Sequence, residues 1–147
     1  NLFSDLKEQF GLSYLFISHD LGVVRHMSDR VAVMYLGRIV EIATRDDLYG
    51  EPLHPYTRIL LDAVAVPDPQ IERARDHVLL QGEVPSVATP PPGCPFHPRC
   101  PSAMPVCSRE IPPLRLHGNR QIACHLYDET AANKAIEAAM DGNGNPN

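Results

Sequence analysis

The sequence Leu15-Phe-Ile-Ser-His-Asp20 is an apolar run that ends at three polar residues. The run from Tyr14 to Ile17 is short and rich in aromatic and aliphatic residues, which favours a strand over a helix. Ligands of open α/β sheets bind at the carboxyl ends of the strands. We therefore expect a strand that carries His19 to such an edge. The alternative is a histidine that bonds only its neighbouring backbone.

The residues after this run alternate between helical and strand patterns. We expect a helix over 21–28 capped by Asp20, a strand over 30–36, a turn at Gly37-Arg38, a strand over 39–42, and a short helix from Thr44 to Gly50. A further helix begins at His54-Pro55, because proline is favoured in a first helical turn, and ends before Pro67. This order of elements indicates an α/β fold.

The stretch 12–41 as a whole resembles the end of an ABC-transporter ATPase domain. In that family, the histidine after the strand hydrogen-bonds the γ-phosphate of ATP and helps to hold the attacking water. The resemblance therefore implies that His19 is a catalytic and ATP-binding residue. It also implies the fold class: α/β, the C-terminal part of a P-loop ABC ATPase sheet, followed by an irregular, metal-stabilised extension rich in proline and cysteine.

Three motifs of that family are absent from the sequence. There is no Gly-x-x-x-x-Gly-Lys-Ser/Thr phosphate loop, no serine-glycine-glycine signature, and no apolar strand ending in Asp-Glu that would bind magnesium. In the family these motifs precede the histidine. We therefore expect this chain to be the C-terminal portion of a longer ATPase, and we do not expect it to bind or hydrolyse ATP alone.

Charge and hydropathy exclude two classes of partner. The 13 basic and 18 acidic residues give a net charge of -5, so there is no basic field for gripping a phosphate backbone, and no nucleic-acid partner is expected. No apolar stretch approaches the ~20 residues needed to span a bilayer, and no secretory segment opens the chain. We expect membrane association only through partner proteins.

The triplet His54-Pro55-Tyr56, which follows Glu51-Pro-Leu, resembles the hallmark of ABC ATPases that energise dipeptide and oligopeptide importers, some of which serve nickel or other small solutes. Helix-start chemistry by itself explains all three residue types, with His54 as a cap and Tyr56 as a packing residue. The triplet therefore indicates the subgroup, and we expect no catalytic role for it.

The segment from Gly82 onward has a different composition. Ten of the fifteen prolines lie between Pro85 and Pro113, which predicts neither a strand ladder nor a continuous helix there. The four cysteines of the chain are Cys94, Cys100, Cys107 and Cys124. In a chain without a secretory signal, they are expected to be metal ligands rather than disulfides.

The spacing of the four cysteines does not decide which metal they bind. The gaps do not fit the paired CxxC motifs of common zinc sites, whereas prolines beside cysteines recur in [4Fe-4S] loops, and thiolates suit both metals. Two disulfides, four free thiols, or a mixed site with His97 or His125 remain as alternatives. The stretch Gly93-Cys-Pro-Phe-His-Pro-Arg-Cys-Pro101, with Cys107 and Cys124, resembles the extension of peptide-importer ATPases, in which four cysteines hold a [4Fe-4S] cluster. The resemblance implies that the cluster stabilises the fold of the extension, with redox sensing as a second role.

We expect four regions: the C-terminal end of the ATPase domain over 1–50, a linker and the His-Pro-Tyr helix over 51–82, a cysteine-rich extension over 83–128, and a helical or flexible tail over 129–147. The resemblance implies ATP and Mg²⁺ as cofactors of the longer protein, at the cytoplasmic face of the cell membrane. The partners it implies are a second ABC ATPase subunit, two transmembrane permease subunits and, indirectly, an extracytoplasmic peptide-binding protein. A non-enzymatic metal-binding interaction module is the alternative function.

Overall fold

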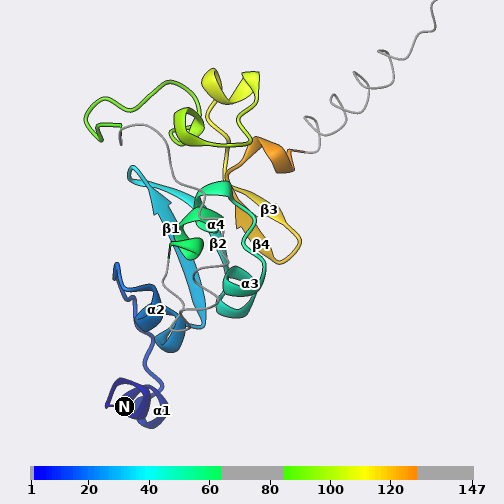
Figure 1. Cartoon of the computed structure of the whole chain (residues 1–147). Helices are drawn as coiled ribbons and strands as arrows, with labels where there is room; N and C mark the ends of the chain where they lie inside the picture. The colour runs from blue at the N-terminus through cyan, green and yellow to red at the C-terminus, as the bar shows by residue number, and fades with distance from the viewer. Residues whose placement is uncertain (1, 64–84, 129–147) are drawn as a thin grey trace, which may run out of the picture.

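The computed structural model describes residues 2–63 and 85–128, with side chains described from residue 6 onward. The α-helices and strands of these ranges are α1 (Leu2–Phe10), α2 (Leu21–Met27), β1 (Arg30–Tyr35), β2 (Arg38–Thr44), α3 (Arg45–Gly50), α4 (Pro55–Asp62), β3 (Arg115–His117) and β4 (Arg120–Ile122) (Figure 1). Three short 3-10 helices, His97–Arg99, Pro105–Ser108 and His125–Tyr127, lie beside the cysteines. None of these helices is long and apolar enough to cross a membrane. The expected tail over 129–147 and the expected end of the fourth helix lie outside the described residues.

Strands β1 and β2 form the predicted hairpin. Its two-residue turn is Leu36-Gly37, one position earlier than the sequence predicts, and both residues have a positive φ, of 45° and 75°. Positive φ at both central positions is what a type I′ turn requires, and this turn matches the right-handed twist of the strands. Along β1, Val31, Val33 and Tyr35 are buried and alternate with exposed residues, so one face of the hairpin lies on the core.

The cysteine-rich extension adds two strands to the same sheet. All neighbours in the order β1-β2-β4-β3 are antiparallel, and β4 pairs with β2 through Glu41 opposite Ile122 and Ile42 opposite Gln121. The expectation of an irregular extension is therefore wrong for residues 115–122. The last proline of the cluster is Pro113, so the residues after it have free N–H groups that can enter a ladder.

The expected strand at Tyr14–Ile17 is not formed. Residues 11–18 are irregular, and the side chains of Leu15 and Ile17 are 92% and 90% exposed. A parallel strand needs neighbours from distant parts of a sequence, whereas a hairpin pairs with itself. Among the described residues, no strand pairs with this run.

The predicted helix starts are confirmed by their caps. Asp20 accepts a hydrogen bond from the Val23 N–H at 3.0 Å and begins α2. Thr44 accepts one from the Asp47 N–H at 3.2 Å and begins α3. Each cap satisfies a backbone donor that has no partner within its helix.

One hydrophobic core joins the hairpin to the extension. Its members come from α2, β1, β2, α3, α4 and the cysteine loops, and they are Val24, Val31, Val33, Tyr35, Val40, Ala43, Leu48, Ile59, Cys94, Phe96 and Cys107. In Figure 1, α1 and α2 lie at one end of the molecule and the green-to-yellow loops that precede β3 lie at the other, while β3 and β4 lie along the sheet between them. The core links the cysteine loops to the sheet.

Candidate functional site

His19 lies in an exposed bend directly before α2. The hydroxyl of Ser18 accepts a hydrogen bond from the Asp20 N–H at 3.0 Å, which shapes this bend. The expected sheet edge does not form here, because the run before His19 is not a strand. The structure therefore brings no other expected site residue to His19, and its role in ATP hydrolysis stays a prediction.

The four cysteines are free thiols. Cys94 and Cys107 are buried, while Cys100 and Cys124 are partly buried. The backbone N–H of Cys94 donates to the carbonyl of Cys107 at 2.8 Å, which ties the first loop to the third.

The four thiols share one electrostatic environment. Burial raises the pKa of the Cys94 and Cys100 thiols and raises that of Cys124 to about 12. A second cause is the proximity of the other cysteines: Cys94, Cys100 and Cys107 all raise the pKa of Cys124. A bound cation would act against both effects, because it takes the place of the thiol protons and stabilises the thiolates.

Backbone N–H groups donate hydrogen bonds to the sulfurs. The N–H of Met104 donates to the sulfur of Cys107 at 3.4 Å. Hydrogen bonds from the backbone of Phe96 and His97 act on Cys94, from Ser102 on Cys100, and from Leu126 on Cys124, and each lowers the pKa of its thiol. Such N–H···S contacts are a feature of cysteine-ligated clusters. These donors would suit thiolate sulfurs.

The described residues contain no group of three or more His, Cys, Asp or Glu side chains that could hold a metal ion, so the expected metal site of the four cysteines stays a prediction. The two histidines beside the cysteines are engaged elsewhere. His97 Nδ1 bonds the carbonyl of Cys94 at 2.9 Å, and His125 Nε2 bonds the carbonyl of Glu110 at 3.0 Å. Both rings brace loop backbone, which leaves the four thiols as the main candidate ligands.

Gly93 permits the close approach of the first and third cysteine loops. Its φ is +71°, and a Cβ built on it would lie 2.3 Å from the Cys107 carbonyl oxygen and 2.8 Å from the Arg109 nitrogen. Only glycine fits this position without moving backbone.

The triplet His54-Pro55-Tyr56 starts α4 as the sequence predicts. The Nδ1 atom of His54 accepts a hydrogen bond from the Tyr56 N–H at 3.0 Å, and Pro55 occupies the first turn. The His54 side chain is 1% exposed, and this burial lowers the pKa of its imidazole to about 4. The ring is therefore neutral near pH 7, which matches its role as an acceptor.

Glu41 supports the triplet from strand β2. Its carboxylate accepts hydrogen bonds from the Leu53 N–H at 3.0 Å and from the His54 N–H at 2.9 Å, and it is fully buried. These donors precede α4, where backbone N–H groups have no partner within the helix. Glu41 thus connects the sheet to the start of α4.

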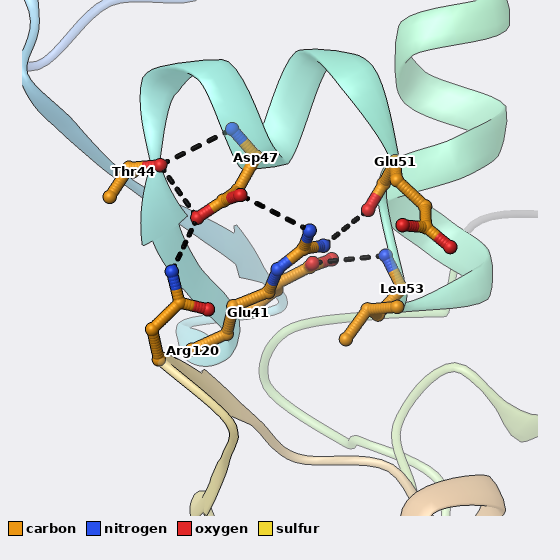
Figure 2. A network of polar contacts seen from close by, with 7 residues as sticks. Glu41, Thr44, Asp47, Glu51, Leu53 and Arg120 are labelled. Atoms are coloured by element: carbon orange, nitrogen blue, oxygen red, sulfur yellow. Dashed lines mark hydrogen bonds and ion pairs between the residues drawn. The ribbon is translucent and has the colours of Figure 1, made fainter.

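A second polar network joins α3 to the β3–β4 hairpin (Figure 2). Asp47 accepts hydrogen bonds from the Thr44 hydroxyl at 2.7 Å and from the Asn119 amide at 2.8 Å, and these two bonds lower the pKa of its carboxyl. Arg120 pairs with Asp47 at 3.5 Å and donates to the Glu51 carbonyl. The network fixes the turn between β3 and β4 against α3.

The sequence did not predict the tertiary contacts of three residues of this region, Glu41, Phe96 and Tyr127. Glu41 is a charged residue in an otherwise apolar strand, and that pattern could have marked it as a buried acceptor. Phe96 and Tyr127 follow the first and last cysteines by two and three positions, and nothing in the sequence pairs them with residues 53–58. Their contacts depend on tertiary structure.

Residues 40–107 match the family model described as "Oligopeptide/dipeptide transporter, C-terminal region". These residues include the His-Pro-Tyr triplet and the first three cysteines, so this part of the chain carries the C-terminal region typical of that family. It is 50% identical over 128 residues to the oligopeptide transport ATP-binding protein OppF of Escherichia coli (strain K12), covering 87% of this chain and 38% of that protein. It is 52% identical over 128 residues to the oligopeptide transport ATP-binding protein AppF of Bacillus subtilis (strain 168), covering 86% of this chain and 39% of that protein.

The chain therefore spans less than two fifths of the length of these relatives. The resemblance to ABC-transporter ATPases that energise peptide importers is confirmed at the level of the family.

Proposed function

We propose that this chain is part of the ATP-hydrolysing subunit of an ABC importer of dipeptides or oligopeptides. The family match over residues 40–107, with His54-Pro55-Tyr56 inside it, carries the proposal. The relatives are themselves named for oligopeptide transport and ATP binding. The sheet β1-β2 and its helices would then be the C-terminal end of the nucleotide-binding domain, over residues 1–50, with the extension over 83–128 attached to it.

His19 is the residue that we propose acts on ATP. In the longer protein, Mg²⁺ and the phosphate loop would neutralise the phosphate charge and an upstream glutamate would act as base. His19 would hydrogen-bond the γ-phosphate and position water. The exposed ring and the irregular run before it are compatible with docking of residues 12–17 as a strand against further strands of that domain.

The test is His19→Ala in the protein that carries this chain together with its phosphate loop. Transport should be abolished while ATP binding is retained, because the substitution removes a contact to the reacting phosphate and leaves the phosphate loop intact. The chain alone should show no sub-millimolar affinity in an ATP titration. Retained transport in the variant removes His19 from the mechanism.

For the extension, we propose a [4Fe-4S] cluster held by Cys94, Cys100, Cys107 and Cys124. Four free thiols in one electrostatic environment, each with a backbone N–H donor, supply the one cysteine per iron that such a cluster needs. A bound cluster would supply a four-point cross-link, which stabilises a segment too poor in apolar residues to fold by burial alone.

Zinc is the alternative metal. Four thiolates around one zinc ion would lie about 3.8 Å apart, from the tetrahedral geometry and a Zn–S bond of ~2.3 Å. Among the described residues, no group of three His, Cys, Asp or Glu side chains could hold a metal ion, so the structure favours neither metal. Anaerobic purification followed by iron, sulfide and zinc analysis decides between them. A colourless protein with stoichiometric zinc contradicts the cluster.

The remaining proposals concern assembly. By analogy with its family, the longer protein would pair with a second ABC ATPase subunit and drive two transmembrane permease subunits, and a peptide-binding protein outside the membrane would deliver the solute. It would lie at the cytoplasmic face of the membrane as a peripheral subunit.

A non-enzymatic, metal-binding interaction module is the second candidate. It is favoured by the integration of the cysteine loops into the core of the described residues. The sequence upstream of Asn1 separates the two. A reading frame encoding a phosphate loop and an Asp-Glu strand supports the ATPase, and its absence supports the module.

A further inference from the structure

The segment Leu53–Arg58 lies between the sheet and the cysteine loops. On the sheet side, Glu41 accepts the N–H groups of Leu53 and His54. On the side of the extension, the segment is contacted by Phe96 and by Tyr127. These two residues follow the first and the last of the four cysteines, which are far apart in the sequence.

Phe96 makes the contact beside the first cysteine. Its side chain is fully buried, and its ring centre lies 5.4 Å from that of Tyr56 and 5.9 Å from that of His54. The ring of Tyr35 in β1 completes the enclosure at 5.2 Å in an edge-on arrangement. Tilted and edge-on aromatic pairs at these separations are attractive beyond the area they bury.

Tyr127 makes the contact beside the last cysteine. Its hydroxyl donates to the Leu53 carbonyl at 3.0 Å and accepts from the Arg58 guanidinium at 3.2 Å. Its backbone N–H donates to the Cys124 carbonyl at 3.1 Å, which links the tyrosine directly to the cysteine. Strand β4, which ends at Ile122, holds the same cysteine from the other direction.

We propose that the His-Pro-Tyr segment positions the cysteines. It holds Phe96 through the rings of His54 and Tyr56, and it holds Tyr127 through Leu53 and Arg58, so it fixes the first and last cysteines relative to each other. Closing the long chain between Cys94 and Cys124 is opposed by conformational entropy, which contacts outside the loop must offset. The triplet supplies such contacts from a helix start that Glu41 anchors to the sheet. The metal ligands of the proposed function are the thiols so positioned, although the positioning itself does not require a metal.

The test measures alkylation rates of each cysteine by mass spectrometry in the whole chain after treatment with a chelator. Phe96→Ala and Tyr56→Ala should each raise the rate at Cys94 by about 10-fold or more, because both open the same local contact. Tyr127→Phe, which removes only the hydroxyl, should act on Cys124 and leave Cys94 near its wild-type rate. Tyr56→Phe retains the ring and should restore protection at Cys94.

Phe10→Ala is the matched control, because Phe10 is 61% exposed in α1 and should leave all four rates unchanged. General destabilisation would instead raise all four rates together in Phe96→Ala. That result, or an unchanged Cys94 rate in Tyr56→Ala, overturns the positioning role.

The metal content of the same proteins, measured before chelation, is a separate readout. Faster iron loss from Phe96→Ala than from Phe10→Ala supports both proposals. The predicted alkylation pattern in a wild-type protein that binds no metal supports the positioning role and contradicts the metal centre.

Discussion

Glu41 and His54 lie thirteen positions apart, and the buried carboxylate of the first accepts the backbone N–H of the second at 2.9 Å. This bond and the one from Leu53 are the polar connections of Glu41 to the start of α4. A buried carboxylate that accepts N–H groups is stabilising only while both donors remain paired.

Glu41→Gln should lower the free energy of unfolding by about 2–3 kcal/mol, because the new amide NH₂ faces one of the two donors and leaves it unpaired. Urea denaturation measures this change. Glu51→Gln is the control, since the Glu51 side chain is exposed and its substitution should stay within about 0.5 kcal/mol of wild type. Equal midpoints for the two variants would contradict the buried role of Glu41.

The buried imidazole of His54 predicts a loss of stability in acid. Its pKa falls from 6.5 to about 4 on folding because of burial, so the unfolded chain takes up this proton first as the pH falls. The contribution of His54 is complete above pH 6.5 and is lost between pH 6.5 and 4, by about 3 kcal/mol at the lower end.

His54→Asn should flatten this part of the profile, because asparagine caps helices well and does not titrate. The unfolding free energies of both proteins at pH 7 and at pH 4.5 are the measurement. The variant should be less stable at pH 7, since it lacks the ring beside Phe96, and should lose less on acidification. Parallel profiles would show that His54 is not the titrating group.

Alanine substitutions at Gly93 and Gly118 should distinguish the cost of steric overlap from the cost of backbone strain. Both have a positive φ, of 71° and 62°, but a Cβ on Gly118 meets nothing within 4 Å whereas one on Gly93 overlaps backbone of residues 107–109. Gly118→Ala should cost about 1 kcal/mol from strain alone. Gly93→Ala should cost considerably more and should expose Cys94 and Cys107 to alkylation. Thermal denaturation with thiol labelling checks both, and similar losses would falsify the close approach.

Thr57 carries a buried hydroxyl that has no hydrogen-bond partner among the described residues. Thr57→Val keeps the shape and removes the polar atom, so stability should be unchanged or raised by about 1 kcal/mol. Thr44→Val should instead lose about 1 kcal/mol, because the Thr44 hydroxyl caps α3 and bonds Asp47. Chemical denaturation of the two variants should shift in opposite directions, or shift only for Thr44→Val.

Local sequence patterns predicted the elements that local forces build. The caps at Asp20, Thr44 and His54 and the hairpin at Gly37 all depend on residues within a few positions of one another. Such contacts can be predicted from a single sequence because the interacting residues are close together in the chain.

Non-local contacts were not predicted. The pairing of Glu41 with Ile122 and the packing of Tyr56 on Phe96 join residues that are distant in the sequence. The hydrophobic pattern of the sequence does not predict such contacts. The prediction of a strand at Tyr14–Ile17 was wrong for a related reason. The apolar pattern predicts a strand, but a strand forms only where a partner strand lies beside it. The cysteines were recognised by type and number, while the N–H groups that face them depend on loop geometry.

The short ladder between β2 and β4 has a consequence for solubility. Without residues 120–123, one edge of strand β2 would have unpaired backbone groups, among them the carbonyl of Val40, which now accepts the Ala123 N–H at 2.9 Å. Such edges recruit strands from other molecules and seed aggregation. The extension thus shields the hairpin from self-association, quite apart from any metal it binds.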